Sequence, residues 1–305
     1  MTPSHQGSFR LFQFSGINVY LHWSWFLVAM LEISSRSSRY SSPVWNLVEY
    51  LTLFGLVLLH EFGHALACRQ VGGRADLIVL WPLGGVAYVS PPPRPGATLW
   101  SIAAGPLVNV ALFVLFGLVA ILDQRWGWAT VNPNAHAFLR DAALMNLGLL
   151  IFNILPIYPL DGGQILRSLL WFPLGRARSL LAASVVGLLG VGLVIAVAVL
   201  QQSIWMGLIA GFILLNCWGG LQEARSLARI AAAPRHEGFA CPACQTAPPV
   251  GALWRCGQCR QSFDIFATGH CPHCGAQYDV INCPECGRAH PISAWVVPPG
   301  ASPSG

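Results

Sequence analysis

Long runs of apolar residues are the feature that most limits how this chain can fold. A transmembrane helix needs about 20 predominantly apolar residues, and the first 221 residues contain six runs near or above that length. Only 10% of all residues are charged, whereas soluble proteins carry about 25%. The runs therefore exclude a single soluble domain and predict an α-helical polytopic membrane protein. The six expected helices cover residues 17–33, 44–68, 98–122, 137–155, 177–200 and 204–221.

The first run is short, and Asn18, His22 and Ser24 interrupt it with polar side chains. Because Arg10 precedes it, a signal peptide is an alternative interpretation. No small-residue cleavage site follows it cleanly, so we expect a retained helix.

Arginine placement predicts the orientation of these helices. If the N-terminus is cytoplasmic, the segments on the inner side carry most of the arginines, whereas the outer segments carry Arg36, Arg39 and Arg125. Positive charge favours the cytoplasmic side, and an even number of helices agrees with two cytoplasmic termini. We therefore expect a multi-pass protein of the inner or plasma membrane, with Glu49 in contact with water near the outer interface.

Residues 76–89 resemble neither a helix nor an ordinary loop. Residues 77–80 and 86–89 are typical of strands, and Pro82 with Gly84 and Gly85 is typical of a turn. Irregular backbone at membrane depth is tolerated only when it is buried in protein or faces water. We expect a re-entrant β-hairpin packed on the helices, with a cytoplasmic surface hairpin as the alternative.

The second run ends in the pattern H-E-x-x-H, formed by His60, Glu61 and His64. Residues four apart share one face of a helix, so both imidazoles can reach one metal ion. Glu61 projects in an adjacent direction and can hold the water of the metal rather than the metal itself. A charge at mid-bilayer costs about 2.5–3.5 kcal/mol, which disfavours a chance occurrence of this pattern inside a membrane helix.

Asp161 is the expected third ligand, because a catalytic zinc ion keeps three protein ligands and one open position. It is the only acidic residue between Asp141 and Glu223, and it follows the fourth run. The second and fourth helices are expected to run in the same direction, so His64 and Asp161 should emerge near the same face. The alternative is that Asp161 caps a helix over residues 164–172.

These motifs resemble those of the site-2 protease family of intramembrane zinc metalloproteases. H-E-F-G-H at 60–64 and N-x-x-P-x-x-x-L-D-G-G at 153–163 carry the resemblance, and residues 16–24, 82–86 and 104–109 extend it. The resemblance implies that His60, His64 and Asp161 bind zinc and that Glu61 activates a zinc-bound water. It further implies hydrolysis of a peptide bond in or near a transmembrane segment of a membrane-protein substrate. The segment between the second and third runs is too short for a PDZ domain, so the chain resembles the compact six-helix branch.

Asn153 is the best candidate for stabilising the oxyanion, because it lies about two helical turns before Asp161. The alternative is an interhelical hydrogen bond, which would also suit Asn109 and Asn146. For Gly55 and Gly105 we favour a role in close helix packing.

The substrate must present an extended backbone, so a helix-weakened transmembrane segment is expected as the partner. The hairpin edge at Leu83, Gly84, Gly85 and Val86 is suited to receive that segment as an added strand.

A metal-binding membrane transporter or sensor without hydrolytic activity is the alternative function. It has no need for a carboxylate such as Glu61, which is not a ligand.

The C-terminal part of the chain differs sharply in composition. We predict a membrane domain over 1–221, a linker over 222–239, a tandem zinc-ribbon region over 240–291 and a disordered tail over 292–305. Eight cysteines in four C-x-x-C knuckles predict two structural zinc ions, each with four thiolates. The knuckle residues are Cys241, Cys244, Cys256, Cys259, Cys271, Cys274, Cys283 and Cys286.

The pairing of these knuckles is not decided by their spacing; we favour the first with the second and the third with the fourth. Disulfides are the alternative, but they require an oxidising compartment, and the arginine distribution places the tail inside the cell. The tail lacks a basic patch, which argues against nucleic acid. A cytosolic protein partner is the favoured ligand of the tail.

Overall fold

The computed structural model describes residues 7–35, 38–81, 84–202 and 204–297. The chain forms two compact units. The first comprises residues 1–175 and 179–220, and the second comprises residues 176–178 and 221–305.

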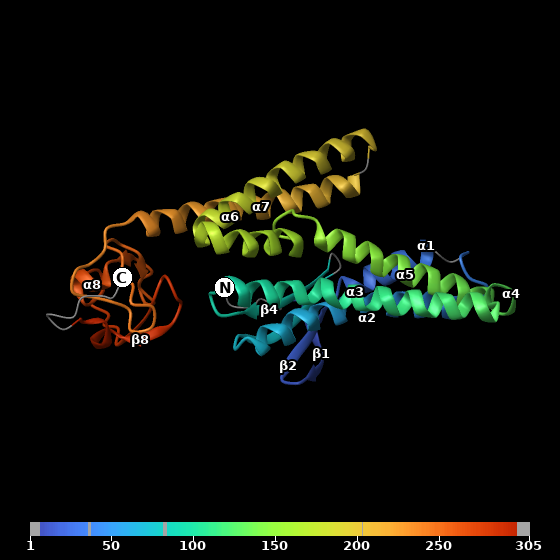
Figure 1. The fold of residues 1–305 in the computed structure, drawn as a ribbon, viewed down its shortest axis with the longest axis horizontal. Coiled ribbons are helices and arrows are strands. Elements are labelled where there is room, and N and C mark those ends of the chain that lie inside the picture. The colour runs from blue at the N-terminus through green and yellow to red at the C-terminus, as the bar shows by residue number, and fades with distance from the viewer. Residues whose placement is uncertain (1–6, 36–37, 82–83, 203, 298–305) are drawn as a thin grey trace. The chain divides into compact units, whose positions relative to one another are not determined.

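Long apolar helices dominate the first unit (Figure 1). Within the described residues, four helices are long and apolar enough to cross a membrane. They are α2 (Pro43–Gln70), α3 (Pro95–Trp126), α5 (Pro133–Ile154) and α6 (Asp161–Leu200). The first three begin at a proline, which fits the first turn because its missing N–H would have no helical acceptor there. Helix α2 packs against both α3 and α5.

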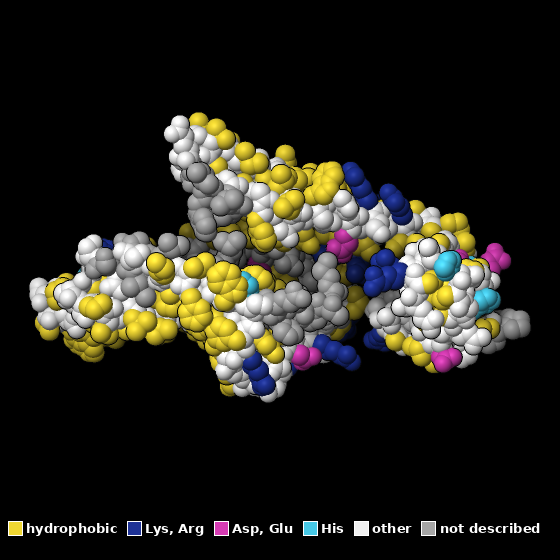
Figure 2. All heavy atoms as spheres, turned by 180° about the vertical axis from the view of Figure 1, so that it is seen from behind, with side chains coloured by type: hydrophobic (Ala, Val, Ile, Leu, Met, Phe, Trp, Pro, Cys, Tyr) yellow, Lys and Arg dark blue, Asp and Glu magenta, His cyan; other side chains and the backbone are white. Residues whose placement is uncertain are grey.

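The exterior of this unit is largely apolar, as Figure 2 shows for one face. Large apolar side chains are exposed along the helices, including Met30 on α1 (Trp25–Ser35) and Leu189 and Leu193 on α6. Such a surface is typical of a protein whose solvent is lipid rather than water. The chain therefore has the character of an integral membrane protein.

The first expected helix is wrong over its N-terminal part. Residues Ile17–His22 form strand β2, and only Trp25–Ser35 are helical, as α1. Along β2, Ile17, Val19 and Leu21 are buried while the residues between them are only partly buried. This two-residue period is that of a strand, and a search for continuous apolar length overlooks it.

The expected hairpin is present, but it belongs to a larger sheet. Strands β1 (Ser8–Phe14), β2, β3 (Arg74–Trp81) and β4 (Gly84–Ser90) form a four-stranded sheet in the order β1-β2-β3-β4. Strands β2 and β3 pair in parallel, and the other two pairs are antiparallel. Strand β4 is therefore an edge strand. Ile17, Ile78 and Leu80 anchor the sheet in one apolar core with residues of α2.

Helix α6 bends near its middle, where Pro173 and Gly175 follow one another closely. Gly175 has φ 76° and ψ 174°, a non-helical conformation within the segment, and Pro173 cannot donate a helical hydrogen bond. The fifth expected helix, 177–200, is the part of α6 beyond this break. Helix α7 (Ile204–Ala232) follows and extends into the expected linker.

The second unit has short elements around a small core. They are β5 (Trp254–Arg255), β6 (Ser262–Phe263), α8 (Ile265–Thr268), β7 (Val280–Asn282), β8 (Ala289–Pro291) and the 3-10 helix η1 (Ile292–Trp295). The expected start of a disordered tail at residue 292 is wrong. Trp295 is fully buried, and its carbonyl accepts a hydrogen bond from the Ala240 amide. The apolar sequence of this region is so sparse that a single tryptophan close to the C-terminus contributes to its core.

Candidate active site

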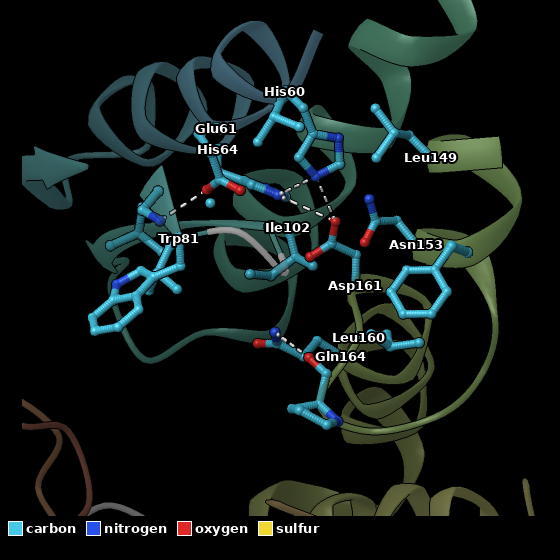
Figure 3. Close-up of a pocket in the computed structure, with 18 of the residues that line it drawn as sticks. His60, Glu61, His64, Trp81, Ile102, Leu149, Asn153, Leu160, Asp161 and Gln164 are labelled. Atoms are coloured by element: carbon cyan, nitrogen blue, oxygen red, sulfur yellow. Dashed lines mark hydrogen bonds and ion pairs between the residues drawn. The ribbon is translucent and has the colours of Figure 1, made fainter. Parts of the chain in front are cut away.

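The two histidines of α2 and Asp161 converge on one point, although Asp161 is about 100 residues away in sequence (Figure 3). The Nε2 atoms of His60 and His64 lie 3.1 Å apart. Asp161 Oδ2 lies 2.9 Å from Nε2 of His60 and 3.2 Å from Nε2 of His64. All three side chains are at most 13% exposed. The structure thus brings together the three residues predicted to bind a metal.

The tautomer of His64 follows from its other neighbour. Its Nδ1 lies 2.9 Å from the Ser101 carbonyl oxygen. That oxygen can only accept, so Nδ1 carries the proton and Nε2 is left with a lone pair. Nδ1 of His60 lies 2.5 Å from Asn109 Oδ1, which assigns its proton in the same way. The neighbours of both rings therefore leave Nε2 free to bind a metal.

These atoms fit a cation. Three acceptors that meet at about 3 Å repel one another unless positive charge lies between them. Tetrahedral zinc, with bonds of about 2.0–2.1 Å to nitrogen and oxygen, holds its ligand atoms about 3.3 Å apart. The observed separations of 2.9–3.2 Å are close to that value.

Helix α3 leaves room for this cluster because it has no side chain at Gly105. A Cβ atom there would overlap the imidazoles of His64 and His60. The expected role of Gly105 in close packing is confirmed, with the histidine rings as the packed groups. The same expectation for Gly55 is not supported, since a Cβ atom there would meet no described atom within 4 Å.

Glu61 lies beside the three candidate ligands and turns toward the sheet. Its side chain is buried, and Oε2 accepts a hydrogen bond of 2.8 Å from the Ala87 amide of β4. Gly85 packs so closely that a Cβ atom there would overlap the Glu61 side chain. Strand β4 thus fixes the position of the carboxylate.

Asp161 is the first residue of α6. Its carboxylate contacts both histidines rather than capping the helix, so the alternative of a helix cap is not what the structure shows. Gly162 and Gly163 are packed against the backbone of residues 154–158, where any Cβ atom would overlap. The glycine pair therefore serves close packing.

A cavity of about 970 Å³ adjoins the cluster. Its polar lining includes Asn153, Gln164 and Asn216, and Figure 3 shows the Asn153 side chain beside the Asp161 carboxylate. Gly84, Gly85 and Val86 also line it. Leu83, the remaining residue of the expected substrate edge, lies outside the described residues. The cavity brings space for a ligand directly to the three acceptors.

The cysteines of the second unit form two clusters, but with a different pairing from the one we favoured. Cys241 and Cys244 meet Cys283 and Cys286, so the first knuckle pairs with the fourth; Cys256 and Cys259 meet Cys271 and Cys274, so the second pairs with the third. Within each cluster, sulfur atoms of the two paired knuckles lie 3.5–3.8 Å apart. Tetrahedral zinc with bonds of about 2.3 Å to sulfur separates its ligands by about 3.8 Å.

The first and fourth knuckles meet because the chain returns on itself, whereas the second and third knuckles form an inner cluster between them in sequence. Main-chain pairing of Phe239 with Val296 and of Ala240 with Trp295 brings the two ends of this region together. In the inner cluster, the Tyr278 hydroxyl and the Cys259 amide donate hydrogen bonds to the Cys256 sulfur and lower its pKa to about 5. Both clusters thus have the geometry of a four-thiolate metal site, and Cys256 favours the thiolate form that binds a metal.

A family model supplies the identification. The model of peptidase family M50 matches residues 49–125 and 114–197 of the chain. This chain belongs to peptidase family M50. Those residues carry both histidines of α2 and the aspartate that begins α6.

Similar proteins agree with this assignment. Zinc metalloprotease MJ0392 of Methanocaldococcus jannaschii is 32% identical over 218 residues, which are 72% of this chain and 61% of that protein. Stage IV sporulation protein FB of Bacillus subtilis is 33% identical over 118 residues, 38% of either chain. The solved structure of the site-2 protease from M. jannaschii matches with a TM-score of 0.52 and 29% identity, covering 70% of this chain and 95% of that one. This chain spans about 61% of the length of zinc metalloprotease MJ0392.

Sequence reasoning missed the groups that orient the side chains of the candidate site. The Ser101 carbonyl and the Ala87 amide are backbone atoms, which no residue pattern can reveal. Asn109 was noticed, but only as a residue suited to interhelical bonding. It does bond to Asn146 of α5, and it also contacts His60.

Proposed function

We propose that this chain is an intramembrane zinc metalloprotease that hydrolyses a peptide bond in or near a transmembrane segment of a membrane-protein substrate. One observation carries the proposal: three converging acceptors and a separate buried carboxylate lie beside a cavity among apolar helices. The membership in family M50 and the relatives named zinc metalloproteases agree with it.

His60, His64 and Asp161 would hold the zinc ion. When bound, zinc supplies Lewis-acid polarisation of the scissile carbonyl and increases the acidity of the attacking water. Glu61 accepts a proton from that water as its oxygen bonds to the carbonyl carbon. When the C–N bond breaks, Glu61 returns the proton to the leaving amine. The Ala87 amide holds the carboxylate in place for both transfers.

Asn153 is proposed to donate a hydrogen bond to the oxyanion that forms during attack. Its place on the cavity wall, beside Asp161, supports this role. A side-chain amide can donate such a hydrogen bond without changing its own charge.

The free edge of β4 is proposed to bind the substrate as an added strand. The Ala87 amide points away from β3 toward Glu61, so this edge faces the catalytic carboxylate. Gly84, Gly85 and Val86 line the cavity at the same edge. A transmembrane segment with helix-weakening residues would unwind most easily to pair there.

We propose six membrane-spanning segments, with α7 and the segment that contains α1 added to the four long helices; α1 alone, with 11 residues, is shorter than the bilayer core. Both termini are proposed to be cytoplasmic, because that orientation places most arginines on the inner side. The sheet is proposed to re-enter the membrane beside α2, with which it shares an apolar core.

The C-terminal region is proposed to bind two structural zinc ions, one in each cysteine cluster. A cytosolic protein is the proposed partner of this region. Its few arginines are balanced by acidic residues, so nucleic acid is not favoured.

The test compares the membrane proteomes of cells that carry the wild type and Glu61→Gln. Loss of the base should slow cleavage about 10²–10⁴-fold, so fragments of a membrane-protein substrate should disappear. Glu223→Gln is the matched control, because Glu223 is an exposed glutamate of α7. If no membrane-protein fragment depends on Glu61, the protease proposal fails and a metal transporter or sensor becomes the better interpretation.

A further inference from the structure

Two buried asparagines lie behind His60, on the side away from Asp161. Asn109 of α3 and Asn146 of α5 are both fully buried. Nδ2 of Asn109 donates to Oδ1 of Asn146 at 2.8 Å, and Nδ2 of Asn146 donates to the main-chain oxygen of Asn109 at 2.9 Å. Oδ1 of Asn109 lies 2.5 Å from Nδ1 of His60. The three side chains form one chain of hydrogen bonds across three helices.

A single carbonyl group determines the direction of every bond in this chain. The main-chain oxygen of Asn109 can only accept, so the NH₂ group of Asn146 must face it. Oδ1 of Asn146 then faces Asn109, and the NH₂ group of Asn109 must face Asn146. This leaves Oδ1 of Asn109 toward His60, which must therefore carry its proton on Nδ1.

The two histidines differ in what holds them. Nδ1 of His64 donates to the Ser101 main-chain carbonyl, whose position the helix itself fixes. Nδ1 of His60 donates to a side-chain amide, which can rotate. Asn146 is the group that prevents that rotation. If Asn109 turned its NH₂ group toward His60, Nδ1 would have to accept, and Nε2 would carry the proton and lose its lone pair.

We infer that Asn109 and Asn146 are positioning residues that keep His60 in the tautomer able to bind zinc. This inference rests on zinc binding by His60, His64 and Asp161, as proposed above. Loss of such a hydrogen bond behind a metal ligand typically lowers metal affinity or activity 10–100-fold. The competing explanation is that the pair only joins α3 to α5.

Two substitutions at residue 109 separate these explanations. Asn109→Leu and Asn109→Asp both remove the NH₂ group that donates to Asn146, so both weaken the link between helices. Only Asn109→Asp keeps an oxygen that accepts the proton of His60. If the pair positions His60, Asn109→Leu lowers zinc affinity 10–100-fold and Asn109→Asp keeps it near that of the wild type. If the pair only joins helices, the two variants behave alike, and the inference is overturned.

The measurement is zinc retained by the purified full chain in a titration with a chelator. His60→Ala defines which part of the total belongs to the membrane site, since the cysteine clusters are the same in every variant. Ser168→Ala is the matched control. It removes a fully buried hydroxyl that bonds to the Gln164 carbonyl of its own helix and does not contact His60, so wild-type affinity is expected.

Two further results separate a failure of this inference from a failure of the proposed function. If His60→Ala retains all of its zinc, the metal site itself is wrong. If His60→Ala loses zinc but a folded Asn109→Leu does not, only the positioning role is wrong. Should Asn109→Leu fail to fold, Asn146→Leu replaces it, because Asn109 is then free to rotate. Asn146→Leu is then expected to bind zinc more weakly than Ser168→Ala, and equal zinc binding by these two variants overturns the inference.

Discussion

The two units hold their candidate metal-binding residues in opposite ways. In the membrane unit, His60, His64 and Asp161 project from long helices whose backbone hydrogen bonds do not involve the cluster. In the C-terminal unit, the cysteines themselves make up much of the core, together with Phe263, Trp295 and a few other apolar residues. Two of the strands there are only two residues long.

This difference indicates what the metal contributes in each place. Helices in lipid satisfy their own backbone groups and need no metal to form. A small region with few apolar residues cannot offset its loss of conformational entropy without cross-links. We therefore expect metal loss to abolish activity in the membrane unit and to abolish folding in the C-terminal unit.

Chelation should produce the largest contrast. Structural zinc contributes about 10–16 kcal/mol to the folding of small metal-binding domains, so a strong chelator should unfold residues 240–297 and leave the helices intact. Limited proteolysis should show rapid cleavage in the C-terminal region, while circular dichroism should keep its helical signal. A C-terminal region that stays protected after metal analysis shows its zinc to be gone would contradict the comparison.

Paired cysteine substitutions test the nested arrangement of the two clusters. Cys241→Ser with Cys286→Ser changes one cluster, so zinc should be lost from that site alone. Cys241→Ser with Cys256→Ser changes both clusters, so zinc should be lost from both. Metal analysis of the purified chain distinguishes the two, with Cys68→Ser in the membrane unit as a control. If Cys241→Ser with Cys256→Ser loses zinc from one site and Cys241→Ser with Cys286→Ser loses zinc from both, consecutive knuckles pair instead.

Two glycines of α3 test whether space is what the membrane site requires. Gly105→Ala would push a methyl group into the imidazoles of His60 and His64. Overpacking of this kind costs about 1–3 kcal/mol, and here it should also displace the ligands and weaken zinc binding.

Gly117→Ala is the control on the same helix, because a Cβ atom there meets no described atom within 4 Å. Alanine is the better helix former by about 1 kcal/mol, so Gly117→Ala should be neutral or slightly stabilising. Thermal unfolding and zinc content of the two variants provide the measurement. Equal zinc affinity in both would show that Gly105 is not needed for the site.

Ion pairs of the two units should give the smallest effects. Arg39 makes two hydrogen bonds to Asp141, of 2.7 and 2.8 Å, and the aspartate side chain is only 8% exposed. Arg39→Ala leaves that carboxylate without its closest partner and should cost about 1–3 kcal/mol. Arg235 and Glu285 form a more exposed pair, for which Arg235→Ala should cost about 1 kcal/mol or less. Unfolding midpoints of both variants check this order, and an equal or larger loss in Arg235→Ala would reverse it.

The surroundings of Arg39 also correct an expectation about Glu49. Glu49 was expected to contact water, but it is 1% exposed. Burial, together with the nearby carboxylates of Glu49 and Asp141, raises the pKa of Tyr40. A residue near a membrane interface can be covered by a loop of its own chain, and apolar run length does not reveal this.

Local patterns were the most predictable part of this molecule. The H-E-x-x-H spacing places two histidines on one helix face, and the apolar runs locate the four long helices of the described chain. The knuckles locate the cysteine sites. Each of these depends on residues within a few positions of one another, where helix and turn geometry leave little choice.

The errors concern segments that must find distant partners. Strand β2 is stable because it pairs with β1 and β3, although its apolar residues continue the run that becomes α1. The four knuckles have nearly equal spacing, so their pairing depends on how the chain returns at Trp295. Neither fact is contained in the residues nearby.

The sequence by itself determined which groups are available for chemistry: two histidines and an aspartate able to hold a metal, a separate carboxylate, and eight cysteines in the C-terminal region. Only the tertiary structure decided which atoms orient that chemistry. Ser101 and Ala87 contribute backbone groups, and Asn146 bonds to Asn109, which in turn contacts His60. The physical reason is that residue identity sets what a side chain can bind. Its tautomer and direction are set by neighbours that packing supplies from other helices and strands.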